Sequence, residues 1–238
     1  MRLDYFLAHT TALSRKEARR AITARRVEVD GLERPRAAST VTPETPVWLD
    51  QKRLPWRDGE RYLMLHKPTG VITATRDSHQ GTVMDLLPES IRQGLHAVGR
   101  LDKDSSGLLL LTSDGQWSHR ITAPARHQDK VYRVTLASPL SDAMVQKLRE
   151  GVVLKGESVA TRPAQVEVLP ENRCRITISE GRYHQIRRMM AAVGNHVSAL
   201  HRERIGGLPL DPALSPGQWR ELTSSEVAAA EGKRPESP

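Results

Sequence analysis

The stretch GRLDKDSSGLLLLTSDG, residues 99–115, joins a charged loop to the longest purely aliphatic run in the chain. Leu108–Leu111 is far too short to span a membrane and has the length of a buried strand. Asp102 comes shortly before that strand, between the cations Arg100 and Lys103. What Asp102 does is therefore the first question that this sequence raises.

A calcium ligand, a structural turn and a reactive group are three competing interpretations of Asp102. The pattern from Asp102 to Gly107 matches the start of a calcium loop, whose twelfth position should supply a bidentate glutamate. That position is Ser113 here, and leucines occupy the middle of the loop, so calcium binding is disfavoured. Asp102 and Ser105 could instead build a turn before the strand. Alternatively, the neighbouring cations keep Asp102 ionised for use as a nucleophile, and spacing alone does not decide between these two.

Composition favours a polyanionic partner. The 238 residues include 36 Lys and Arg against 28 Asp and Glu, a formal net charge of +8, which favours nucleic acid. Hydrophobic residues make up 38% of the chain, which is enough for a core. The residues after Met1 contain no apolar stretch of the kind that predicts a signal peptide. Cys174 is the only cysteine, which excludes an internal disulfide and a multi-cysteine zinc site. We therefore expect a cytoplasmic protein without a membrane segment.

Residues 1–50 have the pattern of a small separate module. Ser14 and Glu17 form the Ser-x-x-Glu pattern of a capping box, which predicts the start of a helix. Glu17 is the only acid of that helix, and no Glu lies four residues from its cations to pair them. A solvated charged helix is the alternative, but charge of a single sign favours phosphate binding. The cations concerned are Arg15, Lys16, Arg19, Arg20, Arg25 and Arg26.

The rest of the chain divides into a linker, a larger domain and a tail. Residues 51–60 contain Pro55 and Gly59 with mixed charge and predict a linker. The larger domain is expected over residues 61–230, and residues 231–238 predict a disordered tail.

Strands and helices are mixed in the larger domain without regular alternation. RYLMLHKPTGVITAT predicts two strands joined by a turn at Lys67–Gly70, and KVYRVTL predicts another strand. SDAMVQKLREG and YHQIRRMMAAVG predict helices, each ended by a glycine. The predicted fold class is α+β, with a mostly antiparallel mixed sheet and flanking helices.

Four stretches of the larger domain resemble the pseudouridine synthases. GRLDKDSSGLLLLTSDG resembles the signature of that family, and Asp102 aligns with its catalytic aspartate. By the same resemblance Tyr132 is an active-site tyrosine, and Arg187 is the basic residue that pairs with the aspartate. Residues 1–31 resemble the S4 RNA-binding fold, which occurs in several RNA-modifying enzymes. The four stretches occur in the order of the family: HKPTG, GRLDKDSSGLLLLTSDG, KVYRV and ISEGRYHQIRRMMAAVGNHV.

The resemblance also implies a substrate. EGRYHQ and AAVGNHVSALHRERIGG favour the branch that modifies small-subunit (16S) ribosomal RNA, although that branch can carry Lys at the position of Arg187. It implies an isomerase that converts a uridine to pseudouridine with no metal or cofactor. A synthase acting on 23S ribosomal RNA and a non-catalytic RNA-binding assembly factor are the alternatives. We expect a monomer.

These considerations define the expected site. Asp102 is expected to carry the chemistry, whereas Asp104 is expected only to build the turn. Arg187 is expected to face Asp102, and Arg188, about 100° further round the same helix, is expected to bind RNA. The residues expected to contact RNA are Arg2, Arg15, Lys16, Arg19, Arg20, Arg25, Arg26, Lys67, Arg100, His184 and Arg188.

Overall fold

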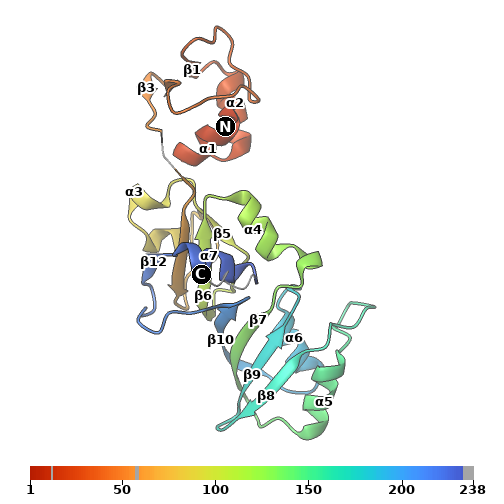
Figure 1. Ribbon diagram of the computed structural model, residues 1–238. Coiled ribbons are helices and arrows are strands. Elements are labelled where there is room, and N and C mark those ends of the chain that lie inside the picture. The colour runs from red at the N-terminus through yellow and green to blue at the C-terminus, as the bar shows by residue number, and fades with distance from the viewer. Residues whose placement is uncertain (12, 57–58, 233–238) are drawn as a thin grey trace. The chain divides into compact units, whose positions relative to one another are not determined.

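The computed structural model describes residues 1–11, 13–56 and 59–232 (Figure 1). These residues form two compact units. The first contains Met1–Arg61 and Leu87–His96, and the second contains Tyr62–Leu86 and the chain from Ala97 onward. The predicted tail lies, from residue 233, outside the described residues.

The first unit packs two helices against a three-stranded antiparallel sheet of order β1-β2-β3. The capping box predicted at Ser14 is confirmed, because its side chain accepts from the Glu17 N–H and the Glu17 side chain accepts from the Ser14 N–H. Leu3, Phe6 and Leu7 are buried in the core of this unit. The elements are α1 (Leu3–Thr10), α2 (Arg15–Thr23), β1 (Val27–Val29), β2 (Val47–Leu49), β3 (Lys52–Arg53) and α3 (Glu89–Arg92).

Part of the stretch predicted as a linker is folded. Strand β3 pairs with β2, and Leu54 and Trp56 pack against the core of the first unit. The rings of Phe6 and Trp56 stack with centroids 5.2 Å apart. Residues 57 and 58 of the same stretch lie outside the described residues.

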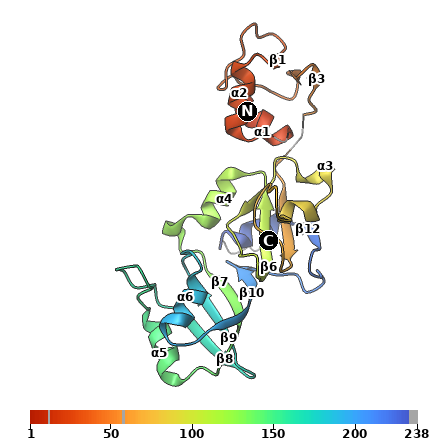
Figure 2. The ribbon, with the colours of Figure 1, turned by 180° about the vertical axis from the view of Figure 1, so that it is seen from behind.

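The second unit is built on one mixed sheet of order β12-β4-β6-β10-β7-β9-β8, with β11 on β10 and β5 on β6. Only the pair β6–β10 is parallel among the described pairs, so the predicted α+β class with a mostly antiparallel sheet is confirmed. Figure 2 shows α6 in front of β8 and β9. The strands are β4 (Tyr62–Lys67), β5 (His96–Val98), β6 (Ser105–Thr112), β7 (Lys130–Leu136), β8 (Gln165–Leu169), β9 (Arg173–Ile178), β10 (Val197–Ile205), β11 (Leu208–Pro209) and β12 (Trp219–Glu221). The helices are η1 (Val83–Leu86), α4 (Gly115–Thr122), η2 (Pro124–Arg126), α5 (Asp142–Glu150), α6 (Gln185–Ala192) and α7 (Ser224–Ala230).

Strand β6 lies in the interior of this sheet, and Leu108–Leu111 is fully buried. Gly107, at its start, has φ +107, and a Cβ there would lie 2.3 Å from the Arg202 carbonyl oxygen of β10. The absence of a side chain at Gly107 therefore lets the two parallel strands approach beside the loop that carries Asp102.

The prediction of a second strand after the turn at Lys67–Gly70 is wrong. Ile72 makes only an isolated bridge with Thr82. The backbone instead turns toward the Asp102 loop: the Gly70 N–H donates to the Lys103 carbonyl at 2.8 Å, and the Thr73 hydroxyl donates to the Leu101 carbonyl at 2.7 Å. These contacts fix the shape of the loop and take the place of a strand pairing.

Candidate active site

A cavity of about 330 Å³ opens in the second unit where several parts of the chain meet. They include the loop before β6, the end of α4, strand β7, the turn before α6, and strand β10. The cavity is lined by charged, imidazole and aromatic side chains, among them Asp102, Lys130, Tyr132, His184, Arg187 and Arg202.

The carboxylate of Asp102 is one-third exposed and faces two basic side chains. His184 Nε2 lies 3.4 Å from Oδ1, and Arg187 Nε lies 4.0 Å from Oδ2. His184 has the left-handed backbone conformation, φ +47, immediately before α6, and it directs its ring to Asp102. The structure thus brings together a partly accessible carboxylate, an imidazole and a guanidinium.

Arg187 lies between two carboxylates. Its Nη2 forms an ion pair with Asp104 Oδ2 at 2.8 Å, and its Nη1 donates to the Val197 carbonyl at 3.2 Å. The Nε that faces Asp102 is buried and has no hydrogen-bond partner among the described residues. Asp104, expected only to build a turn, therefore also holds the guanidinium beside Asp102. The direct pairing of Arg187 with Asp102 stays a prediction, because 4.0 Å is beyond hydrogen-bond distance.

Lys67 is fully buried beneath the same loop. Its ammonium donates to the carbonyls of Pro68 at 3.0 Å, Asp102 at 2.9 Å and Ser105 at 2.7 Å. Burial lowers the pKa of Lys67 to about 8, and the nearby Asp102 and Asp104 act in the opposite direction. The expectation that Lys67 contacts RNA is wrong, because the side chain is enclosed and holds the backbone of the Asp102 loop instead.

Tyr132, on β7, is almost buried and packs beside Arg202. The Arg202 guanidinium carbon lies 5.9 Å from the ring centroid, and its Nη1 is 3.4 Å from the tyrosine hydroxyl. Its Nε donates to the Leu108 carbonyl at 2.8 Å, which links β10 to β6. Lys130 lines the same wall, and burial, with Arg202 nearby, lowers its pKa to about 8. Arg202 and Lys130 were missed in the sequence, because strand alternation does not distinguish a buried cation from an exposed one.

The sequence suggested that the arginines of the first unit have no acidic partner, but three of them pair with one aspartate. Asp4, fully buried on α1, accepts from Arg2 at 3.1 Å, Arg15 at 3.0 Å and Arg19 at 2.9 Å. Burial alone would raise the pKa of Asp4, but these hydrogen bonds hold it well below its usual range. The sequence did not reveal Asp4 as the partner, because Asp4 lies on α1 and only acids one helical turn from the cations of α2 were considered. All three arginine side chains remain about half exposed.

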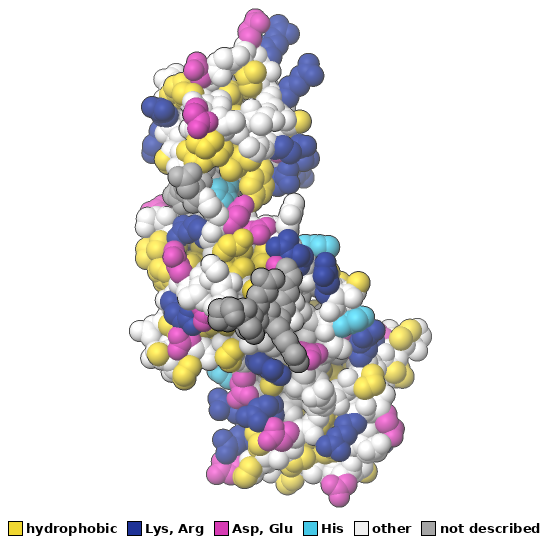
Figure 3. Space-filling view, in the orientation of Figure 1, with side chains coloured by type: hydrophobic (Ala, Val, Ile, Leu, Met, Phe, Trp, Pro, Cys, Tyr) yellow, Lys and Arg dark blue, Asp and Glu magenta, His cyan; other side chains and the backbone are white. Residues whose placement is uncertain are grey.

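The other predicted RNA contacts differ in their surroundings. Arg26 is paired with Asp50 at 2.8 Å. Arg188 is held by Glu157 at 2.7 Å and is only one-quarter exposed. On the face drawn in Figure 3, basic side chains of the second unit are interspersed with acidic ones. The remaining cations are exposed: Lys16, Arg20, Arg25 and Arg100, of which Lys16 and Arg20 line an open groove with Arg15 and Arg19.

In the described part of the chain, no group of three or more His, Cys, Asp or Glu is arranged to hold a metal ion. None of the helices in residues 1–11, 13–56 and 59–232 is long and apolar enough to cross a membrane.

Comparison with known proteins gives the same two-part organisation. The family model described as RNA pseudouridylate synthase matches residues 61–192, and that of the S4 domain matches residues 1–47. The ribosomal small subunit pseudouridine synthase A of Escherichia coli (strain K12) is 50% identical over 96% of this chain and 99% of its own. The enzyme of the same name from Yersinia pestis is 49% identical over 96% and 97%. A crystal structure of a pseudouridylate synthase has a TM-score of 0.71 at 40% identity, covering 97% of this chain and 99% of that one.

Proposed function

We propose that this chain, which belongs to the RNA pseudouridylate synthase family, converts a uridine of 16S ribosomal RNA into pseudouridine. The observation that carries the proposal is the cavity in which Asp102, one-third exposed, shares the wall with Tyr132 and faces His184 and Arg187. The choice of 16S ribosomal RNA is supported by the names of relatives about 50% identical over nearly the whole chain.

The reaction is an isomerisation. The N1–C1′ glycosidic bond of the uridine breaks, the base turns, and a C5–C1′ bond forms while C5 loses a proton and N1 gains one. The products therefore contain the same atoms and electrons as the substrate. The cavity volume is in the range of small-molecule sites and can admit one nucleotide turned out of its stack.

Each of the three central side chains has a role in this scheme. Asp102 is the group that attacks the sugar or the base, or removes a proton on the way to a glycal. Arg187 and the buried ammonium of Lys67 place positive charge beside the negative charge of Asp102. Tyr132, on the cavity wall, lies against the uracil and is placed to assist removal of the C5 proton.

The first unit supplies affinity for the RNA in this proposal. The exposed cations along α2, Lys16 and Arg20 among them, contact phosphates, while Asp4 holds Arg15 and Arg19 in fixed positions beside them. We further propose that the protein acts as a monomer in the cytoplasm, where ribosomal RNA is modified.

Mapping pseudouridine in 16S and 23S ribosomal RNA from cells with and without the protein tests this function. We expect one 16S uridine to lose its modification and to regain it with the wild-type gene but not with Asp102→Asn. A lost site in 23S ribosomal RNA would instead show a large-subunit synthase. Full modification of both RNAs without the protein would show that it is not the enzyme.

A further inference from the structure

Tyr183 and His184 form a stacked aromatic pair at the wall of the cavity. Their ring centroids are 3.8 Å apart with an interplanar angle of 18°. His184 faces Asp102, whereas Tyr183 is 68% exposed. Exposing a large aromatic ring to water forgoes the gain of burying it, so its position beside a reactive carboxylate calls for an explanation.

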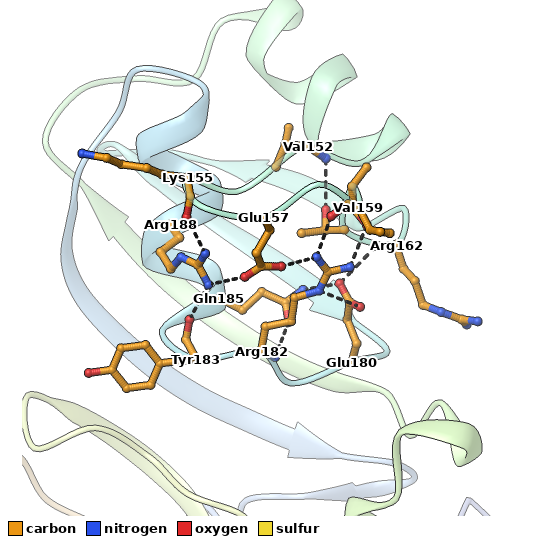
Figure 4. Close-up of polar contacts among 12 residues, drawn as sticks. Val152, Lys155, Glu157, Val159, Arg162, Glu180, Arg182, Tyr183, Gln185 and Arg188 are labelled. Carbon is orange, nitrogen blue, oxygen red and sulfur yellow. Dashed lines mark hydrogen bonds and ion pairs between the residues drawn. The ribbon is translucent and has the colours of Figure 1, made fainter.

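The turn that carries this pair is held by a clamp centred on Glu157 (Figure 4). Glu157 pairs with Arg182 at 2.5 Å and with Arg188 at 2.7 Å. Hydrogen bonds from Arg182, and to a smaller extent from Arg188, keep the pKa of Glu157 below its usual value, so the clamp is charged at neutral pH.

Both arginines also bind backbone carbonyls. Arg182 donates to those of Val159 at 2.8 Å and Ala160 at 2.7 Å, and Arg188 donates to those of Lys155 at 2.9 Å and Tyr183 at 3.2 Å. The carbonyl of the exposed tyrosine is therefore fixed directly by the clamp.

A second set of contacts holds the other side of the turn. The Gln185 side chain accepts from the Arg182 N–H at 2.8 Å and donates to Glu180 at 2.7 Å. His184 has a left-handed backbone conformation that costs energy for a residue with a side chain. In Figure 4 the Tyr183 ring points away from the clamp, so the polar network fixes the backbone while the ring stays available.

We propose that Tyr183 is a stacking platform for the base next to the target uridine in the RNA. The inference rests on the function proposed above. A uridine that turns into the cavity leaves its neighbours without a stacking partner. Single-stranded RNA is bound elsewhere by exposed aromatic rings on which unstacked bases lie. His184 covers one face of the Tyr183 ring, and the exposed remainder of the ring receives the neighbouring base.

The test uses the full-length enzyme and synthetic RNA that contains the mapped uridine, with either neighbouring base present or replaced by an abasic ribose. For the wild type, removing the stacked base should raise KM between about 5-fold and about 150-fold, the range for one base on an aromatic ring. Tyr183→Ala should raise KM on intact RNA by a similar factor, and the abasic RNA should then add no further loss. Tyr183→Phe should behave as the wild type, because the ring survives. Val168→Ala, at another exposed apolar side chain outside the cavity, is the matched control and should change nothing.

Three results would overturn the inference. The first is an unchanged KM of Tyr183→Ala on intact RNA, and the second is a loss in Tyr183→Ala that multiplies with that of the abasic RNA, which would show independent effects. A loss shared equally by Tyr183→Phe would assign the effect to the hydroxyl group. Failure of the wild type to form any pseudouridine in 16S ribosomal RNA is a different result, since it removes the proposed function and this inference with it.

Discussion

Replacing Lys67 by Met tests whether the Asp102 loop is held from beneath. The substitution keeps a long unbranched side chain and removes the ammonium that donates to the carbonyls of Pro68, Asp102 and Ser105. We expect a loss of stability and of kcat, with little change in RNA affinity, because the side chain is enclosed.

The magnitude follows from two opposing effects. A carbonyl left buried without a partner costs about 1–3 kcal/mol. Those of Pro68 and Ser105 lose the ammonium here, whereas that of Asp102 still accepts from the Ser105 N–H. Burial lowers the pKa of Lys67 from 10.5 to about 8. Removing that ammonium returns about 3 kcal/mol, from about 1.4 kcal/mol per unit of pKa. The net loss in unfolding free energy is therefore on the order of 1 kcal/mol. Displacement of Asp102 by about 1 Å would lower kcat about 100-fold.

The same shift fixes the sign of a pH effect. Between pH 8 and pH 10.5 the unfolded chain holds the Lys67 proton and the folded chain does not, so stability rises with pH. The wild type should gain up to about 3 kcal/mol relative to Lys67→Met across that window. Below pH 8 the cost of the buried charge is present in full.

Urea unfolding of the second unit by circular dichroism, at pH 7 and at pH 10, measures the stability, and single-turnover kinetics measure the chemical step. Lys103→Met is the matched control, because this exposed lysine adjoins Asp102 and its ammonium binds only the Gln80 side chain among the described residues. It should lose less than about 0.5 kcal/mol. Wild-type stability and kcat in Lys67→Met would refute the reasoning, as would a loss confined to RNA affinity.

Four further outcomes are expected. Asp102→Asn should form no pseudouridine while RNA affinity stays within a few-fold, and turnover by this variant would contradict the mechanism. Asp104→Asn, which frees the Arg187 guanidinium, should lower kcat several-fold. Arg187→Lys should keep substantial activity and Arg187→Met should lose most of it, measured as kcat on the same RNA. Arg20→Ala should weaken binding and reduce the slope of log K against log salt by about 1, which a filter-binding series would show. Asp4→Asn should destabilise the first unit above pH 3.8. The difference from the wild type should shrink steadily as pH falls below that value, because the unfolded chain then takes up the proton while the folded chain still holds Asp4 ionised.

Local patterns predicted the elements whose causes are local. The Ser14–Glu17 capping box needs only four residues, and both of its hydrogen bonds are present. The aliphatic run Leu108–Leu111 marked the buried strand on which the site is built, since few other environments accept four leucines in succession. The irregular mixture of strands and helices likewise indicated the fold class, which does not depend on any single contact.

Contacts between distant segments escaped the same reasoning. Lys67 resembles a surface lysine until the loop near Asp102 closes over it, 35 positions further along the chain. Arg19 and Asp4 lie 15 positions apart on two different helices, so the residue periodicity of a single helix does not predict their ion pair. Arg202 is buried because β10 lies between β6 and β7, and the order of strands in the sheet cannot be read from the sequence of β10 itself.

The parallel pair β6–β10 has a consequence for when the enzyme becomes active during its synthesis. Arg202 of β10 binds the Leu108 carbonyl of β6 across 94 positions of sequence. Closing so long a loop carries an entropic penalty, and it can occur only after β10 has left the ribosome. A nascent chain that ends before β10 lacks one wall of the cavity and the guanidinium beside Tyr132. Catalysis is therefore withheld from incomplete chains, even when the first unit and its basic helix have already been translated.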